Sequence, residues 1–420
     1  MNKKVLINIA SLLGVQGIGY LIPLITLPYL VRVLHPHGYG IYSYALAISQ
    51  YFVLLVDFGF NLSITKKISQ NKDDLFEVSS VFWNTLSCKS ILLLLGFLIT
   101  LIWSVLDPLF ENNRYVLISA FTIVLGNMLF PIWLFQGKEE MANIAFSNVC
   151  AKLIAVPAIF LLVTEQSDVW LACLINGVTF VIAGIIGLYI VHKRNWIIWV
   201  VPSFKKMKVE YKEALHIFIS TAAINIYTSS ITVILGLMTS PTAVGYFSAA
   251  DKIRLAVQGL IGPVSQALYP RINALMIKDK RMAFNTIHFL LKVQGGIALS
   301  ISIVLFLLSE KIILFMYGVN YIDAISVMKV LAWLPFIVAV SNVFGYQTLL
   351  TLNLAKILSR AVLLGAICSM LMIFPLIKTW NIAGAAFTIL LAELIVNQSM
   401  LIYIAHNKIP IFKKVKNDEG

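Results

Sequence analysis

The feature that most constrains this chain is a series of twelve long apolar stretches. They lie roughly at 5–31, 41–65, 80–106, 115–136, 144–163, 169–191, 215–238, 246–269, 288–308, 326–350, 361–377 and 382–404. A helix needs about 20 mostly apolar residues to cross a bilayer. Continuous apolarity favours helices over a β-barrel, whose strands alternate over about ten residues. The sequence therefore predicts an all-α integral membrane protein with about twelve transmembrane helices.

The composition excludes several classes of protein. Of the 420 residues, 60% are hydrophobic and 12% are charged, against about 45–50% and about 25% in soluble domains. A cytosolic enzyme, a disulfide-stapled secreted domain and a disordered chain are therefore excluded. The four cysteines fall inside apolar stretches without metal or redox spacing, so we interpret them as small hydrophobic residues. The sequence predicts no catalytic residues, no metal site and no Gly-rich phosphate loop.

The positive charges indicate how the chain is oriented. Twenty-two Lys and Arg residues occur in the connections and tails on the side that holds both termini, and four occur on the opposite side. Cytoplasmic loops carry an excess of positive charge, so both termini are predicted to be cytoplasmic. This asymmetry accounts for most of the net charge of +13 without a nucleic-acid partner.

The predicted spans fall into two halves. The expected division is an N-terminal six-helix lobe at 1–191, a cytoplasmic amphipathic linker at 192–214, a C-terminal six-helix lobe at 215–404 and a cytoplasmic tail at 405–420. The linker is rich in Lys and aromatic residues, so we expect it to lie on the anionic inner leaflet, with a solvated loop as the alternative.

A short motif repeats across this division. The pattern G-x-[YF]-S-x-A begins at Gly40 and again at Gly245, 205 residues apart, and in each half it opens the next predicted span. This placement favours a parallel repeat, as in transporters whose halves surround a central substrate path.

Ionisable residues inside the spans suggest a substrate site. Such residues are costly at mid-bilayer, by about 2.5–3.5 kcal/mol, and usually face a polar cavity. There are nine of them: Asp57, Lys89, Lys152, Asp251, Lys252, Arg254, Lys292, Lys329 and Glu393. Six are basic, so a cavity lined by them would suit a phosphate or pyrophosphate group. For each basic residue the alternative is extension toward the nearer interface.

The candidate substrate-binding residues from this set are Arg254, Lys89, Lys252 and Lys329. Arg254 is eight residues into its span, and Asp251, one turn earlier, is positioned to pair with it. Asp57, Asp251 and Glu393 are candidates for ion coupling, because a buried carboxylate can bind a proton or a cation. The alternatives are a boundary position for Asp57, a structural ion pair for Asp251 and packing against Asn397 for Glu393.

Several segments resemble one known family. PYLVRVLHPHGYGIYSYA from Pro28, FGFN from Phe58, FPIWLFQGKEEM from Phe130, GYFSAADKIR from Gly245 and LYPRI from Leu268 are similar in order and spacing to the Wzx-type O-antigen flippases. These belong to the multidrug/oligosaccharidyl-lipid/polysaccharide exporter superfamily. The resemblance covers nearly the whole chain, and His35 stands where the family usually has Gly before Pro36.

The resemblance implies twelve helices in two six-helix lobes around a central cationic cavity. It implies movement of undecaprenyl-pyrophosphate-linked oligosaccharide units to the periplasmic leaflet of the bacterial inner membrane, by alternating access. It adds Arg32, in the motif after the first span, to the substrate-binding candidates. The expected partners are membrane lipids, an O-antigen polymerase and a chain-length regulator. No cofactor is expected beyond a coupling proton or sodium ion.

Other functions remain as alternatives at this stage. A membrane O-antigen polymerase or glycosyltransferase would act on the same substrate, but the longest outer connection, 309–325, is short and lacks a cluster of carboxylates or His. A multidrug antiporter of the same superfamily would favour an acidic or aromatic interior. A teichoic-acid or capsule exporter is a closer variant. The sequence favours transport over catalysis.

Overall fold

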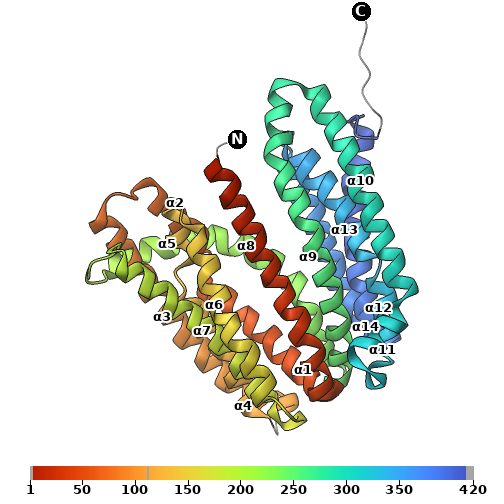
Figure 1. The fold of residues 1–420 in the computed structure, drawn as a ribbon, viewed down its shortest axis with the longest axis horizontal. Coiled ribbons are helices and arrows are strands. Elements are labelled where there is room, and N and C mark those ends of the chain that lie inside the picture. The colour runs from red at the N-terminus through yellow and green to blue at the C-terminus, as the bar shows by residue number, and fades with distance from the viewer. Residues whose placement is uncertain (1–2, 111–112, 413–420) are drawn as a thin grey trace, which may run out of the picture. The chain divides into compact units, whose positions relative to one another are not determined.

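All the secondary-structure elements of the described residues are helices. The computed structural model describes residues 3–110 and 113–412. The first elements are α1 (Lys3–Asp57), α2 (Phe60–Gln70), α3 (Leu75–Leu106), η1 (Pro108–Phe110), α4 (Arg114–Leu129), α5 (Ile132–Gly137), α6 (Met141–Leu162), η2 (Gln166–Asp168), α7 (Val169–Lys193) and α8 (Phe204–Met238). They are followed by α9 (Pro241–Lys278), α10 (Lys280–Leu307), α11 (Ser309–Tyr317), η3 (Val319–Tyr321), α12 (Ala324–Leu331), α13 (Leu334–Asn342), the π-helix η4 (Val343–Leu350) and α14 (Ala355–His406) (Figure 1).

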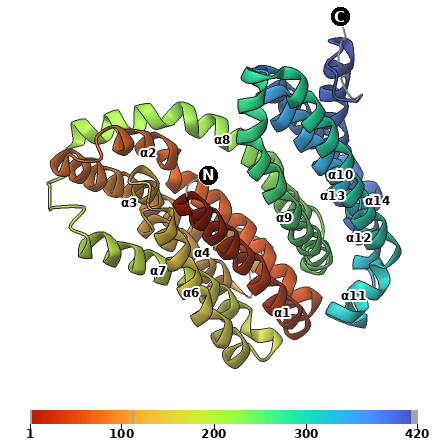
Figure 2. The ribbon, with the colours of Figure 1, turned by 45° about the horizontal axis from the view of Figure 1, so that its top comes forward.

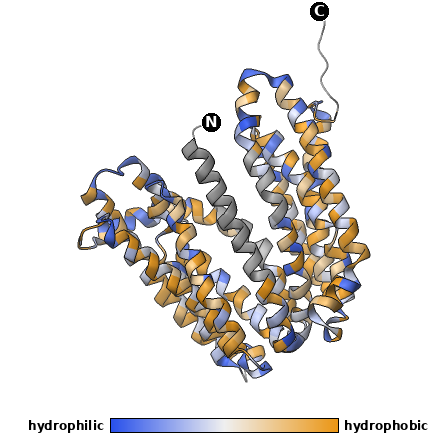
Figure 3. Cartoon of the chain, viewed as in Figure 1, coloured by the Kyte–Doolittle hydropathy of each residue, from blue (hydrophilic) through white to orange (hydrophobic). Residues whose placement is uncertain are grey.

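The predicted apolar stretches coincide with helical segments, but those at 41–65 and 115–136 each cross a break between two helices. Eight segments of the described residues are long and apolar enough to cross a membrane, and two of them, Ile25–Gln70 and Ala355–His406, each contain parts of two predicted spans. In the longer helices the backbone turns at His35 (φ 54°) in α1 and at Asn381 (φ 49°) in α14, at the junctions expected from the sequence. Hydrophilic residues gather at the helix ends, and the middles are mostly hydrophobic (Figure 3).

The chain divides into two compact units, Met1–Gly245 and Tyr246–Gly420. The first unit therefore contains α8, which the sequence-based division assigns to the second half. Tyr51 of α1 donates a hydrogen bond to Ser230 of α8 over 2.7 Å, and the rings of Phe58 and Phe218 stack at 4.5 Å. The division into two six-helix lobes on either side of the 192–214 linker stays a prediction.

The connection from α7 to α8 turns at Asn195 (φ 52°) and is not helical from 196 to 203 (Figure 2). It lies against α3, because the Ile198 N–H donates to Ser79 Oγ over 2.9 Å and the Ser203 N–H donates to Asn84 Oδ1 over 2.8 Å. The first turns of α8 then cover an apolar cluster that includes Phe60, Phe82 and Met207. The linker is thus a packed part of the first unit.

Candidate functional site in the first unit

Two helix breaks lie beside one cavity in the first unit. Between α1 and α2 the chain turns at Phe58 (φ 43°) and Gly59 (φ 77°). These dihedrals end the helix, and glycine adopts the second at little cost. A side chain at Gly59 would also collide with α8, because its Cβ would lie 2.9 Å from the Ala214 carbonyl oxygen. The position therefore suits glycine for two reasons.

The second break separates α4 from α5. Pro131 has no N–H to continue the α4 ladder, and the residue before a proline is driven toward extended backbone. Phe130 adopts such a conformation, with φ −82° and ψ 107°. Discontinuous helices in transporters often frame binding sites, because their free backbone groups and side chains face a cavity. Both breaks here fall within the FGFN and FPIW segments.

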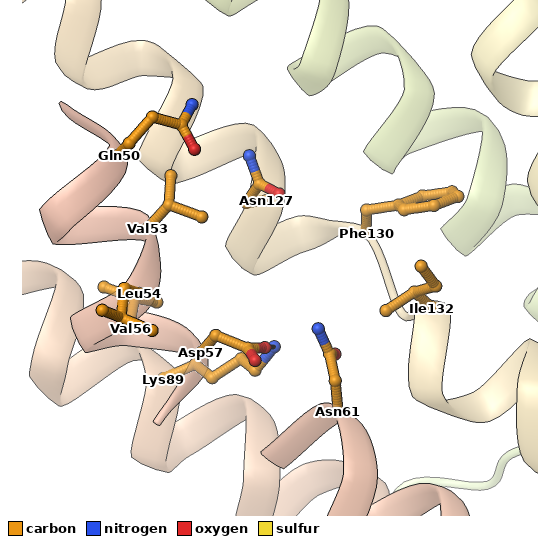
Figure 4. Close-up of a pocket in the computed structure, with 10 residues that line it drawn as sticks. All are labelled: Gln50, Val53, Leu54, Val56, Asp57, Asn61, Lys89, Asn127, Phe130 and Ile132. Atoms are coloured by element: carbon orange, nitrogen blue, oxygen red, sulfur yellow. Dashed lines mark hydrogen bonds and ion pairs between the residues drawn. The ribbon is translucent and has the colours of Figure 1, made fainter. Parts of the chain in front are cut away.

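Asp57 and Lys89 form an ion pair at this cavity. Lys89 Nζ lies 3.1 Å from Asp57 Oδ1, and the two side chains point toward one another (Figure 4). Lys89 comes from α3 and its side chain is 3% exposed, whereas Asp57, the last residue of α1, is 26% exposed. The pair is therefore open on its carboxylate side. Long-range pairing explains how Lys89 is accommodated far from the ends of α3.

The cavity has a volume of about 230 Å³ and a partly polar lining. Besides the ion pair, it is lined by three amide side chains: Gln50, Asn61 and Asn127. Asn61 Oδ1 is buried and accepts no hydrogen bond from the described chain. An ammonium and several amides around a void can bind an anionic or hydroxyl-rich group. The sequence did not identify these neutral amides; only the position of Asn61 in the FGFN segment pointed toward it.

The second unit holds a separate cluster. Arg254 Nε lies 2.6 Å from Asp251 Oδ1, and Arg254 Nη1 donates to Gln258 Oε1 over 2.6 Å. The predicted i, i+3 pairing is therefore confirmed. Glu393 of α14 lies close enough to Arg254 for their charges to interact. This places one basic and two acidic candidates together.

The remaining candidates lie outside both clusters. Arg32, Lys252 and Lys329 are exposed. Within the described residues, the candidate side chains thus form two local groups, each inside one unit, and each contains both signs of charge. Because each group contains an ion pair, its net positive charge is lower than the number of basic residues inside the predicted spans suggests. A single central cationic cavity stays a prediction.

Sequence comparisons identify a protein family and individual proteins to which this chain is similar. The sequence model of the family "Polysaccharide biosynthesis protein" matches residues 5–276. A protein of Escherichia coli (strain K12) named "Putative O-antigen transporter" is 35% identical over 96% of this chain and 97% of its own length. A protein of the same name from Shigella dysenteriae is 30% identical over 94% of this chain and 98% of its own length.

Solved structures share the fold. "Lipid II flippase MurJ, inward closed conformation" aligns with a TM-score of 0.72 at 14% identity, covering 94% of this chain and 87% of that one. An inward-facing multidrug resistance MATE family transporter of the MOP superfamily aligns with a TM-score of 0.73 at 14% identity, covering 94% and 96%. At this identity the likeness concerns the fold.

Proposed function

The chain belongs to the polysaccharide biosynthesis protein family, and on this basis we propose that it flips undecaprenyl-pyrophosphate-linked O-antigen units across the bacterial inner membrane. It is a multi-pass membrane transporter and not an enzyme. The direction is from the cytoplasmic to the periplasmic leaflet, with both termini in the cytoplasm. Two relatives at 30–35% identity over nearly their whole length carry the name of O-antigen transporters, and a lipid II flippase shares the fold.

The observation that carries the proposal is the Asp57–Lys89 pair beside the cavity. A pyrophosphate must leave water to cross the bilayer, and this desolvation is costly unless fixed charges replace hydration. Lys89 is nearly buried, and it pairs with a carboxylate that remains partly open. An incoming diphosphate can compete with Asp57 for the ammonium, because both are anionic oxygen acceptors for the same donor.

This competition also offers a route to energy coupling. When the substrate takes Lys89, Asp57 loses its partner, and an unpaired carboxylate in a low-dielectric site favours binding of a proton or sodium ion. Release of the substrate restores the pair and expels the ion. In the second unit, Asp251 and Glu393 beside Arg254 would serve the same purpose. Alternating access of two six-helix lobes around a cationic path is part of this proposal.

Arg254 is the second substrate-binding residue in the proposal, with Arg32, Lys252 and Lys329 as further basic contacts. An O-antigen polymerase and a chain-length regulator are the expected protein partners. Among the alternatives, a polymerase is disfavoured because the relatives at 30–35% identity carry the name of O-antigen transporters.

The test is the lipopolysaccharide banding pattern of a strain that lacks the gene. The proposal predicts complete loss of O-antigen bands and their return with the wild-type gene, because no repeat unit reaches the periplasm. Lipid A-core that carries a single repeat would identify a polymerase instead. An unchanged ladder in a strain without a second exporter would assign the transporter to another substrate.

A further inference from the structure

The connection from α7 to α8 exposes large apolar side chains although its backbone is fixed to the protein. Trp199 is 68% exposed, Val201 is 74% exposed and Phe204 is 80% exposed. We refer to these three residues as the linker face. The segment cannot turn them inward without breaking its bonds to α3, in which Ile198 and Ser203 donate their N–H groups and Trp83 Nε1 donates to the Ile198 carbonyl over 3.0 Å.

An aromatic contact fixes the position of the linker face. The rings of Trp83 and Trp199 meet edge to face at a centroid distance of 4.4 Å. Trp83 stands at the start of the apolar part of α3, whose exposed side chains further along the helix include Leu94, Leu98 and Ile102. These side chains belong to a span long enough to cross a membrane. The linker face therefore continues a lipid-facing surface at its end.

Lysines stand next to this apolar group. Lys205, Lys208 and Lys212 are exposed in the first turns of α8, at spacings of three and four residues that place them on one face of a helix. The opposite face is buried through Met207, Glu210 and Ala214. Lys206 is held by the protein, because its Nζ donates to Ser80 Oγ over 2.8 Å.

We propose that the linker face inserts into the headgroup boundary and that Lys205, Lys208 and Lys212 bind the phosphates of anionic phospholipids. Aromatic and apolar side chains beside several Lys residues are the combination that binds anionic membrane surfaces. A neutral or cationic protein partner would leave the lysines without counter-charge. Because the backbone is already fixed to α3, lipid binding orders few further residues and holds the start of α8 at the bilayer surface.

The first experiment measures which lipids the whole protein retains. It is extracted from bilayers of phosphatidylcholine and phosphatidylglycerol, and its bound lipids are counted by native mass spectrometry. The variant K205Q/K208Q/K212Q is expected to lose most of the excess of phosphatidylglycerol. The control K278Q/K280Q/K356Q removes the same number of exposed charges from the second unit and is expected to retain it. Equal retention by both variants would overturn the proposal.

The second experiment locates the linker face. Val201→Cys, in a background with Cys88, Cys150, Cys173 and Cys368 replaced by Ala, carries an environment-sensitive dye in a lipid nanodisc. Brominated lipid is expected to quench the dye, and aqueous iodide is not. Quenching by iodide would show that the segment faces water, and protection from both quenchers would show that protein covers it; either result rejects the proposal. Neither experiment uses the transported substrate, so both are independent of the proposed function.

Discussion

Gly40 and Gly245 occupy the same position in the two copies of the repeated motif, and each lies against the backbone that precedes the other. A Cβ added to Gly40 would be 1.7 Å from the Pro241 carbonyl oxygen, and one added to Gly245 would be 2.0 Å from the Pro36 carbonyl oxygen. Each proline precedes its own glycine by four residues. The contact is therefore reciprocal.

We expect Gly40→Ala to destabilise the protein. The added methyl would meet backbone atoms that cannot rotate away, and such overpacking typically costs about 1–3 kcal/mol. The thermal unfolding midpoint in detergent should fall, and O-antigen export should fall with it. Gly296→Ala is the control, because a Cβ there meets nothing within 4 Å. An unfolding midpoint for Gly40→Ala equal to that of the control would contradict the close contact.

Removal of Lys89 should leave an unpaired carboxylate. Breaking a fully buried pair costs about 3–5 kcal/mol, and because Asp57 is 26% exposed we expect a smaller loss, roughly 1–3 kcal/mol, for Lys89→Met. The double variant D57N/K89M should recover thermal stability without recovering export. Export at the wild-type level by the double variant would show that the pair is only structural.

Arg254→Ala should reduce export by roughly 10- to 100-fold, which corresponds to loss of a charge-assisted contact of about 1.5–3 kcal/mol. Protein levels in the membrane should stay near normal, because Asp251 is still partly exposed. Lys252→Ala, at the exposed neighbouring position, provides the comparison and should have a weaker effect. Normal export by a well-expressed Arg254→Ala variant would remove this residue from the site.

The N-terminal end of α8 should contribute a dependence of stability on pH. Burial raises the pKa of the Glu210 carboxyl above its ordinary value of 4.5, although the Lys67 ammonium opposes the shift. A raised folded-state pKa stabilises the fold at low pH, and this contribution is lost as the pH rises through the folded-state value. The unfolding midpoint of the wild type relative to Glu210→Gln should thus decrease from about pH 4.5 upward. A constant difference across this range would contradict the prediction.

The long elements were predictable from sequence because a membrane-spanning helix has an unmistakable apolar length. The Asp251–Arg254 pair was predictable for a related reason, since three residues on a helix determine which side chains meet. The helix breaks at 58–59 and 130–131 were missed, because apolar residues continue across both. Local dihedrals at Phe58 and Pro131, rather than hydropathy, end those helices.

Contacts between segments far apart in the chain could not be predicted from the sequence. Asp57 and Lys89 are 32 residues apart and come from different helices, so no spacing rule links them. Asn61 and Asn127 carry no charge and do not stand out in an apolar stretch. The repeated motif was visible as two copies, but only the packing shows that the copies touch.

The first unit extends to Gly245, so the protein cannot be reassembled from its two sequence halves as if each were self-contained. A fragment that ends in the 195–203 connection would lack α8, and with it the partners of Tyr51 and Phe58. A gene split in the short turn at 239–240 would instead leave every one of those contacts within one fragment.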